Sequence, residues 1–224
     1  MTMQIPATDL VILAGGQARR MNGMNKLLQQ FDDQIQLSKI CQKFKSEVQS
    51  IWVNSHRDSS IYKQIEPNIY CYSDDQTGFL GPLMGMKSAW SHLKLDYALF
   101  IPCDVTYIPN QVLIKLHRAL QKNPQALVAY VAINGDALYP FCLLKRESLP
   151  ILKQQISAGK LSLRECFKQL NSQQVILQKQ SLFCVTVSRK NIAYRPYPVR
   201  WQIHLPERCI LMRSQRRFGR YRIL

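Results

Sequence analysis

The stretch that decides the fold is DLVILAGGQARRMNGMNK, residues 9–26. Its apolar start ends abruptly at Gly15 and Gly16, which is the pattern of a buried strand that leads into a glycine-rich loop. Glycine has no Cβ and tolerates positive φ, so the backbone N–H groups of such a loop can approach phosphate oxygens closely. Arg19 and Lys26 would then supply positive charge to a polyphosphate. The stretch predicts a phosphate-binding loop, and a basic surface turn remains the alternative.

Five further apolar runs follow, separated mostly by segments with the 3.6-residue spacing of helices. We expect these runs to be strands, at residues 50–54, 69–73, 97–102, 126–133 and 139–144. Helices are expected after Gly81-Pro82, from Pro109, and from Ser162, which has capping-box spacing to Glu165. Because strands that alternate with helices favour a parallel sheet, we predict an α/β fold of three layers: a mainly parallel sheet with helices on both faces.

Asp104 is a second candidate site residue, because it follows the apolar run at residues 97–102. Ligands of open parallel sheets gather beyond the carboxyl ends of the strands. A carboxylate there suits Mg²⁺, which commonly takes one or two protein carboxylates and completes its shell with phosphate and water. Asn54 and Asp74 also follow apolar runs, and either could bind a base or a ribose. A turn or cap is the alternative role for each of the three.

The histidines and cysteines show no pattern of a metal site or a catalytic site. His56, His92, His117 and His204 have neither ligand spacing nor a partnered acid, so we expect surface or helix positions. The seven cysteines form no C-x-x-C pair, which argues against a zinc site or a disulfide framework and favours thiols that fill the core. No apolar run approaches the ~18 residues of a membrane span, and no secretory signal is evident. We therefore expect a cytoplasmic protein that does not enter the membrane.

Positive charge is concentrated near the C-terminal end. Residues 181–224 hold ten Lys or Arg and one acidic residue, Glu207, which accounts for +9 of the net charge of +16. After residue 185 the apolar pattern loses its period and three prolines interrupt it. We expect one domain at residues 1–185 and an atypical, poorly packed basic tail at residues 186–224. A nucleic-acid-binding protein that uses this tail is a rival hypothesis, but no recognition motif accompanies the arginines.

Several short motifs occur in a fixed order along the chain. They are LAGG at 13–16 with Arg19, Met21, Gly23 and Lys26, then GPLMGM at 81–86, PCD at 102–104, YIP at 107–109, DALYP at 136–140 and AGK at 158–160. Together these motifs resemble the MobA family of molybdenum cofactor guanylyltransferases, over about residues 9–170. The resemblance implies a fold related to the nucleotide-diphospho-sugar transferases and a nucleotidyltransferase domain at residues 1–185.

The resemblance also implies an activity and its partners. The implied reaction is the Mg²⁺-dependent transfer of GMP from GTP to molybdenum-bound molybdopterin, which yields the guanine dinucleotide cofactor and pyrophosphate. Cytidylyl transfer to the same cofactor is the nearest alternative, because related transferases share these motifs.

The roles that the resemblance implies fall on residues of the matching motifs. The GTP contacts are Leu13, Ala14 and Gly15, with Gly16 in the same loop; Lys26 binds the phosphates, Asn54 and Asp74 bind the nucleoside, and Asp104 binds both GTP and Mg²⁺. Lys26, Arg19 and Asp104 with its Mg²⁺ form the catalytic set, since phosphoryl chemistry mainly requires alignment and the neutralisation of negative charge.

The sequence departs from the family pattern in two places. Asn25 stands where the family has aspartate, so one carboxylate near the phosphates becomes neutral. The family also ends in an Asn-x-Asn-Thr-Pro-like segment that helps to complete the metal and substrate site, and this segment is missing after Leu182. The tail resembles the product of a shifted reading frame. We therefore expect it to leave the site incomplete.

Overall fold

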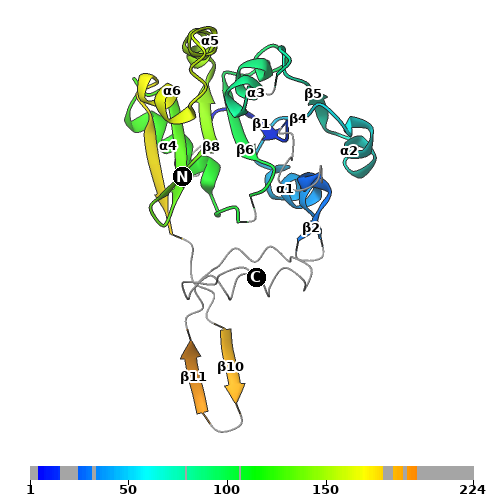
Figure 1. Cartoon of the computed structure of the whole chain (residues 1–224). Coiled ribbons are helices and arrows are strands. Elements are labelled where there is room, and N and C mark those ends of the chain that lie inside the picture. The colour runs from blue at the N-terminus through cyan, green and yellow to red at the C-terminus, as the bar shows by residue number, and fades with distance from the viewer. Residues whose placement is uncertain are drawn as a thin grey trace, which may run out of the picture. The chain divides into compact units, whose positions relative to one another are not determined.

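The structure is a computed structural model, shown in Figure 1, that describes residues 5–15, 25–31, 34–78, 80–105 and 107–178, and the backbone at 184–188 and 191–195. The chain divides into two units, Met1–Lys179 and Gln180–Leu224. The first unit holds a seven-stranded sheet in the order β5-β4-β1-β6-β8-β7-β9. These strands are, in chain order, β1 (Thr8–Leu13), β4 (Ile51–Asn54), β5 (Tyr70–Tyr72), β6 (Tyr97–Pro102), β7 (Val128–Ile133), β8 (Asp136–Lys145) and β9 (Gln173–Leu177).

Strand β1 lies near the middle of the sheet, between β4 and β6, and pairs with both in parallel. All six of its residues are buried. Leu10 and Ile12 belong to the core on one face of the sheet, and Val11 and Leu13 belong to the core on the other face. A strand that is covered on both faces has a continuous apolar run, which is why residues 9–13 show no alternation.

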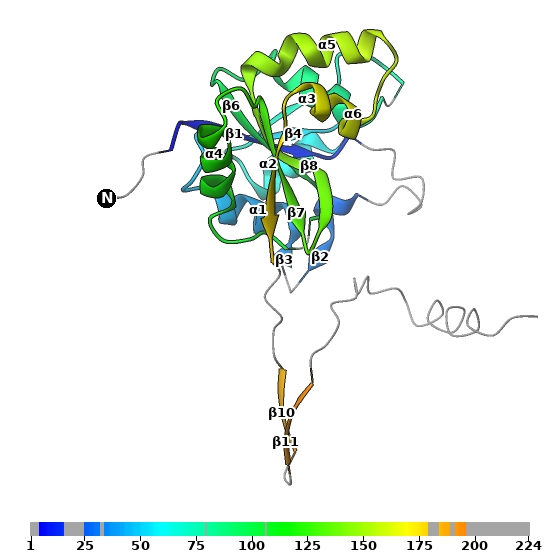
Figure 2. The same ribbon diagram turned by 90° about the vertical axis from the view of Figure 1, so that its left-hand side faces the viewer.

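Helices cover both faces of this sheet, as Figures 1 and 2 show. Buried residues of α1 (Gln36–Phe44), α2 (Ser59–Ile65) and α4 (Val112–Lys122) pack in the core that contains Leu10. Buried residues of α3 (Pro82–Ala89), α5 (Leu149–Ser157) and α6 (Leu163–Gln169) pack in the core that contains Val11. The expected three-layer architecture with a mainly parallel sheet is therefore confirmed.

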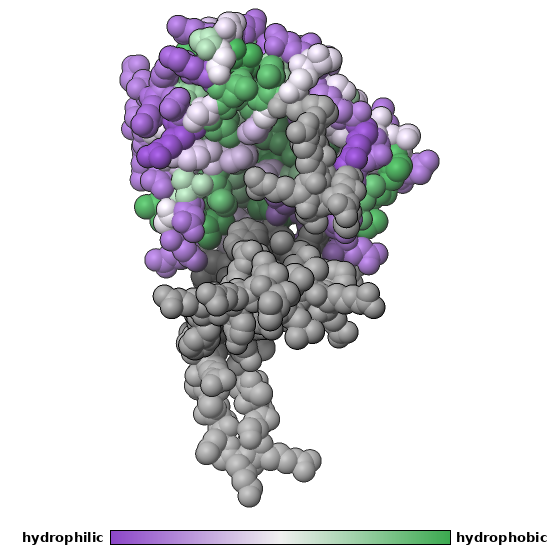
Figure 3. All heavy atoms as spheres, viewed as in Figure 1, coloured by the Kyte–Doolittle hydropathy of each residue, from purple (hydrophilic) through white to green (hydrophobic). Residues whose placement is uncertain are grey.

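Shorter elements complete the first unit. A 3-10 helix, η2 (Lys26–Leu28), precedes a small hairpin of β2 (Gln30–Phe31) and β3 (Gln34–Ile35), and a second 3-10 helix, η3 (Arg146–Ser148), leads into α5. On the face drawn in Figure 3, hydrophilic residues cover most of the periphery of this unit and apolar residues show between them in its middle. In the described part of the chain, no helix is both long enough and apolar enough to cross a bilayer.

The sequence-based prediction located six of the seven strands of this sheet, but one helix begins later than expected. The helix predicted from Pro109 starts at Val112, because Gln111 adopts a left-handed conformation with φ of 58° and interrupts the helical path. The helix after Gly81 and the helix capped by Ser162 are present, and the Ser162 hydroxyl accepts from the backbone N–H of Glu165. In this unit, no residue range was predicted from the sequence for α1, α2, α5 and β9, nor for the short elements η2, β2, β3 and η3.

The direction of the strands determines where a site can form. Strands β1, β4, β5 and β6 are mutually parallel, whereas β8 runs antiparallel to both of its neighbours. The carboxyl ends of the four parallel strands therefore lie along one edge of the sheet. The loops that leave this edge carry most of the residues singled out in the sequence.

In the second unit, strands β10 (Cys184–Ser188) and β11 (Asn191–Arg195) pair antiparallel. This hairpin was not expected from the sequence. The other residues of the predicted tail, 186–224, lie outside the described residues. The predicted boundary at residue 185 and the poor packing of the tail therefore stay predictions.

Candidate functional site

The ends of the parallel strands bring the candidate residues to one edge of the sheet. Leu13 ends β1, Asn54 ends β4, and Asp104 comes two residues after the end of β6. The backbone of the β1 loop is tied to both neighbours: the Ala14 N–H donates to the carbonyl of Asn54 at 2.9 Å, and the Cys103 N–H donates to the carbonyl of Leu13 at 3.1 Å. The glycine-rich loop thus begins between the end of β4 and the residue before Asp104.

Lys26 and Asp104 form an ion pair at this edge. The Lys26 Nζ donates to Oδ2 of Asp104 at 2.7 Å. The Asp104 side chain is 54% exposed and the Lys26 side chain 35%. The hydrogen bond to Asp104 raises the pKa of the Lys26 ammonium above its ordinary value, so this lysine carries a full positive charge at neutral pH. The pair presents one cation and one carboxylate to solvent beyond the strand ends.

Asn25 fixes the start of η2 and therefore the position of Lys26. Its side-chain oxygen accepts from the N–H of Leu27 at 3.1 Å, which caps the 3-10 helix. Its Nδ2 donates to Oδ2 of Asp58 at 2.5 Å and to the hydroxyl of Tyr62 at 2.7 Å. Asn25 therefore connects η2 to helix α2. An aspartate could not make these two donations, so the departure from the family pattern has a structural role in this chain.

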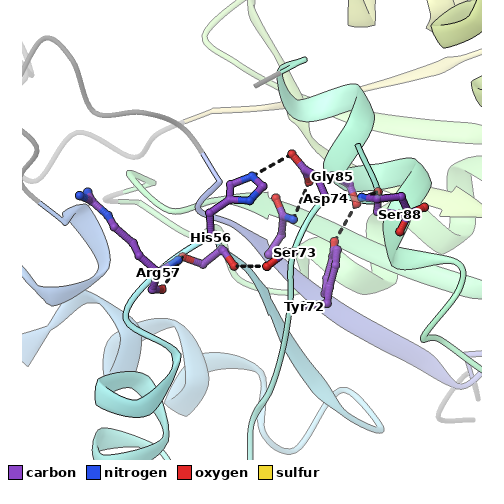
Figure 4. A network of polar contacts seen from close by, with 10 residues as sticks. His56, Arg57, Tyr72, Ser73, Asp74, Gly85 and Ser88 are labelled. Carbon is purple, nitrogen blue, oxygen red and sulfur yellow. Dashed lines mark hydrogen bonds and ion pairs between the residues drawn. The ribbon is translucent and has the colours of Figure 1, made fainter. Parts of the chain in front are cut away.

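A second group of polar residues lies at the ends of β4 and β5, as Figure 4 shows. The Asn54 Nδ2 donates to Oδ1 of Asp74 at 2.8 Å, and Nε2 of His56 lies 3.1 Å from Oδ2 of Asp74. The Asp74 side chain is 5% exposed. The expectation that no histidine has a partnered acid is therefore wrong for His56. Residues 56 and 74 are separated in sequence and meet only because β4 and β5 are neighbouring strands.

Two glycines make room for the side chain of Asn54. A Cβ on Gly15 would lie 2.8 Å from Oδ1 of Asn54, and a Cβ on Gly85 would lie 2.5 Å from the same atom. At both distances a Cβ would force the Asn54 amide to shift, so glycine at these two positions lets the amide keep its place. The hydroxyl of Tyr72 also donates to the carbonyl of Gly85 at 2.7 Å. The β1 loop, β4, β5 and α3 thus meet at one asparagine.

Other groups near this edge do not form a metal or nucleophile site. Among the described residues, no group of three or more His, Cys, Asp or Glu could hold a metal ion. Burial raises the pKa of the Cys103 thiol to about 11, so Cys103 is a neutral neighbour of Asp104 and not a reactive thiolate. His117 is buried on α4 and contacts Thr8, which lies at the end of β1 opposite the glycine-rich loop. With its side chain 54% exposed, Asp104 is a carboxylate of this edge that a cation from solvent could reach.

Comparison with known sequences gives a clear relationship. Residues 10–175 match the profile of the MobA-like NTP transferase domain. A molybdenum cofactor guanylyltransferase of Acinetobacter baumannii (strain ATCC 17978) is 72% identical over 178 residues, which cover 80% of this chain and 85% of that protein.

This chain belongs to the MobA-like NTP transferase family. It is thus a nucleotidyltransferase, as the motifs at residues 13–16 and 102–104 predicted. Solved structures agree on the fold. Molybdopterin-guanine dinucleotide biosynthesis protein A from Archaeoglobus fulgidus superposes with a TM-score of 0.59 at 15% identity, over 75% of this chain and 83% of that chain. A CMP:2-keto-3-deoxy-manno-octonic acid synthetase complexed with CTP gives 0.58 at 14% identity, over 78% and 91%.

The structure describes most of the residues that the sequence analysis assigned to the site. The structure brings Leu13, Ala14, Gly15, Lys26, Asn54, Asp74 and Asp104 to the same edge of the sheet. Gly16 and Arg19 lie outside the described residues, so their expected contacts stay predictions. Sequence reasoning gave no site role to two residues of this region: Gly85, which it quoted only within the motif at 81–86, and His56. The available signal for His56 was its position two residues after Asn54, just beyond a strand end.

Proposed function

We propose that this protein transfers GMP from GTP to molybdenum-bound molybdopterin in the cytoplasm, with Mg²⁺ as the required ion. The products are the guanine dinucleotide cofactor and pyrophosphate. The observation that supports this proposal most directly is the Lys26–Asp104 pair, which presents a cation and an open carboxylate beside the glycine-rich loop of a nucleotidyltransferase. The name of the relative at 72% identity supports the guanylyl donor and the molybdenum cofactor acceptor.

The reaction joins two anionic substrates, so charge neutralisation is its main requirement. An oxygen of the terminal phosphate of molybdopterin attacks the α-phosphorus of GTP, and the bond from that phosphorus to the bridging oxygen breaks as pyrophosphate leaves. No protein nucleophile is needed, because the attacking phosphate is already ionised. Lys26 would bind the phosphates as a fixed cation, Arg19 would add a second positive charge, and the loop from Leu13 to Gly16 would offer its backbone N–H groups.

The carboxylate of Asp104 fits the demands of Mg²⁺. The ion prefers oxygen ligands, keeps several waters, and is usually bound by one or two carboxylates together with substrate phosphates. Asp104 is more than half exposed, and within the described ranges its hydrogen bond is the one that Oδ2 accepts from Lys26, which leaves Oδ1 available. When bound, Mg²⁺ would neutralise phosphate charge and polarise the phosphorus–oxygen bond. A single carboxylate suits an ion that arrives with the nucleotide.

The polar residues at the ends of β4 and β5 would receive the nucleoside. Asn54 and Asp74 offer amide and carboxylate groups, which can bond to the edge of a base or to ribose hydroxyls. They lie on the opposite side of β1 from Asp104, since the strand order is β5-β4-β1-β6. A nucleotide bound along the edge would therefore cross the glycine-rich loop, with its nucleoside over β4 and β5 and its phosphates toward β6.

The donor nucleotide is the point to test first. The purified full-length protein would be supplied with Mg²⁺, molybdenum-bound molybdopterin, and either GTP or CTP, and pyrophosphate release would be measured. We expect release with GTP and little with CTP. Faster turnover or clearly tighter binding with CTP would show that the protein is a cytidylyltransferase, and the guanylyl assignment would be wrong.

A further inference from the structure

The carboxylate of Asp74 is held from two sides by residues of different exposure. Asn54 donates to Oδ1 at 2.8 Å, and Nε2 of His56 lies 3.1 Å from Oδ2. Asn54 is 3% exposed, whereas the imidazole of His56 is 29% exposed. Figure 4 shows the contact between His56 and the carboxylate of Asp74. His56 is therefore the outer of the two partners.

Both bonds are needed to fix the plane of this carboxylate. A buried carboxylate without donors on its oxygens is costly, and a carboxylate with a donor on one oxygen can still rotate. The Asn54 amide is buried beside Gly15 and Gly85, which limits how far it can move with such a rotation. His56 comes from the loop between β4 and α2 and is, among the described residues, the other hydrogen-bond partner of the Asp74 carboxylate. Since an ionised carboxylate only accepts hydrogen bonds, Nε2 is the nitrogen of His56 that carries a proton.

We propose that His56 is a positioning residue of the nucleoside site: it holds the Asp74 carboxylate at the angle at which that group bonds to the nucleoside. Each carboxylate oxygen has about two acceptor positions, so Asp74 keeps the capacity to accept from a ligand while Asn54 and His56 hold it. This inference rests on the proposed function, because the nucleoside of the substrate is what Asp74 receives. It assigns His56 no contact with the phosphates, which belong to Lys26 and the glycine-rich loop.

Three variants at residue 56 distinguish the effect of the hydrogen bond from the effect of the ring. His56→Gln retains an N–H donor, His56→Phe retains a flat ring without a donor, and His56→Ala retains neither. His92→Ala is the matched control, because His92 contacts Trp52 and Tyr72 through its ring and lies on a different loop. Thermal unfolding of each variant would confirm that it is folded before binding is measured.

Two ligands distinguish the binding of the nucleoside from the binding of the phosphates. Equilibrium binding of GTP with Mg²⁺ reports on nucleoside and phosphates together, and binding of inorganic tripolyphosphate with Mg²⁺ reports on the phosphates alone. We expect His56→Ala and His56→Phe to bind GTP about tenfold more weakly, which is the usual effect of one hydrogen bond to a charged group. His56→Gln should stay within about threefold of the wild type. All variants should bind tripolyphosphate like the wild type.

Three results would overturn the inference. GTP binding by His56→Ala that equals the wild type would remove the role, and so would equal losses for GTP and tripolyphosphate, because these would indicate general damage to the loop. His56→Gln as weak as His56→Ala would show that the donor is not what matters. If the wild type itself preferred CTP, the guanylyl proposal would fail separately, and the same comparison made with CTP would still decide the role of His56.

Discussion

Asp104 and Lys26 are 78 positions apart in the sequence, yet their side chains meet at 2.7 Å beyond the end of β6. Asp104 is half-exposed and contributes little packing, so its removal should change the stability by less than about 1 kcal/mol. We expect Asp104→Ala to lower Mg²⁺-dependent turnover about 100-fold or more, because a carboxylate that holds the cation acts directly on the phosphates. Asp96→Ala is the control, since Asp96 lies at the opposite end of β6 and is 83% exposed. Wild-type turnover in Asp104→Ala would contradict its role.

Lys26 should act on the phosphates and not on the nucleoside. We expect Lys26→Ala to weaken the binding of GTP more than that of GMP, by about tenfold or more, because the triphosphate presents more charge to a single cation. Isothermal titration with both nucleotides would measure the difference. Lys43→Ala provides a control, since the Nζ of Lys43 also donates to a side chain, that of Asn110, and Lys43 belongs to helix α1 and not to the proposed site. Equal losses for GTP and GMP would remove the phosphate role.

Gly85 should be essential for the geometry of Asn54, although it sits in a helix where alanine is intrinsically favoured by about 1 kcal/mol. In Gly85→Ala the new methyl group would lie 2.5 Å from Oδ1 of Asn54, so the amide must move and its bond to Asp74 must lengthen. We expect GTP to bind about tenfold more weakly. In an Asn54→Ala background, Gly85→Ala should cause little further loss, and strictly additive losses would show that the two residues act separately.

At the scale of elements, Asn25 joins η2 to α2 through donations that require an amide. Asn25→Asp would place a second carboxylate against Asp58, which now lies 2.5 Å from the Asn25 nitrogen. We expect a loss of about 1–3 kcal/mol in the free energy of unfolding, measured by urea denaturation, and weaker GTP binding as Lys26 loses its support. The double variant Asn25→Asp with Asp58→Asn restores one donor and one acceptor. It should recover most of the loss, and an equally unstable double variant would contradict this explanation.

The strands of this fold could be predicted from sequence because their signal is local. Residues 10–13 and 97–102 are continuous apolar runs, since both faces of β1 and β6 are covered by helices. Strand β9 gives no such signal: it lies at the edge of the sheet and alternates between partly buried and exposed residues, with Ile176 66% exposed. The start of α4 was missed because it depends on one left-handed residue, Gln111, whose conformation the residue type does not predict.

In the candidate site, too, some residues could be predicted from the sequence and others could not. Gly15 and Asp104 could be chosen because each follows an apolar run, and strand direction alone brings such ends together; Leu13 was chosen through the resemblance to the family. The role of His56 could not be predicted, since its partner Asp74 reaches it only through the pairing of β4 with β5. Asn25 was recognised as a departure from the family pattern, but its donation to Asp58 depends on where α2 begins. Contacts that join different elements are the part that a single sequence does not reveal.

At the scale of the whole molecule, the match to the family profile ends before the basic tail begins. The family profile ends at residue 175, and the Acinetobacter baumannii relative matches over 178 residues, which is 85% of its own length. The rest of that relative lies outside the match. The ten Lys or Arg among residues 181–224 give this chain a strongly basic end. A core cannot bury so many cations without partners, so we expect this end to pack poorly.

Two experiments on the full-length protein test the tail. Trypsin should cut first beyond residue 186, because an exposed basic segment offers both accessible backbone and many cleavage sites, while residues 5–178 should resist for much longer.

A chimera in which residues 179–224 are replaced by the C-terminal segment of the Acinetobacter baumannii relative should bind GTP as the wild type does but turn over faster, because the family's closing segment would complete the surroundings of Asp104. If the tail resists trypsin as long as the core, or if the chimera turns over more slowly than the natural chain, then residues 186–224 are an integral part of the enzyme and the prediction is wrong.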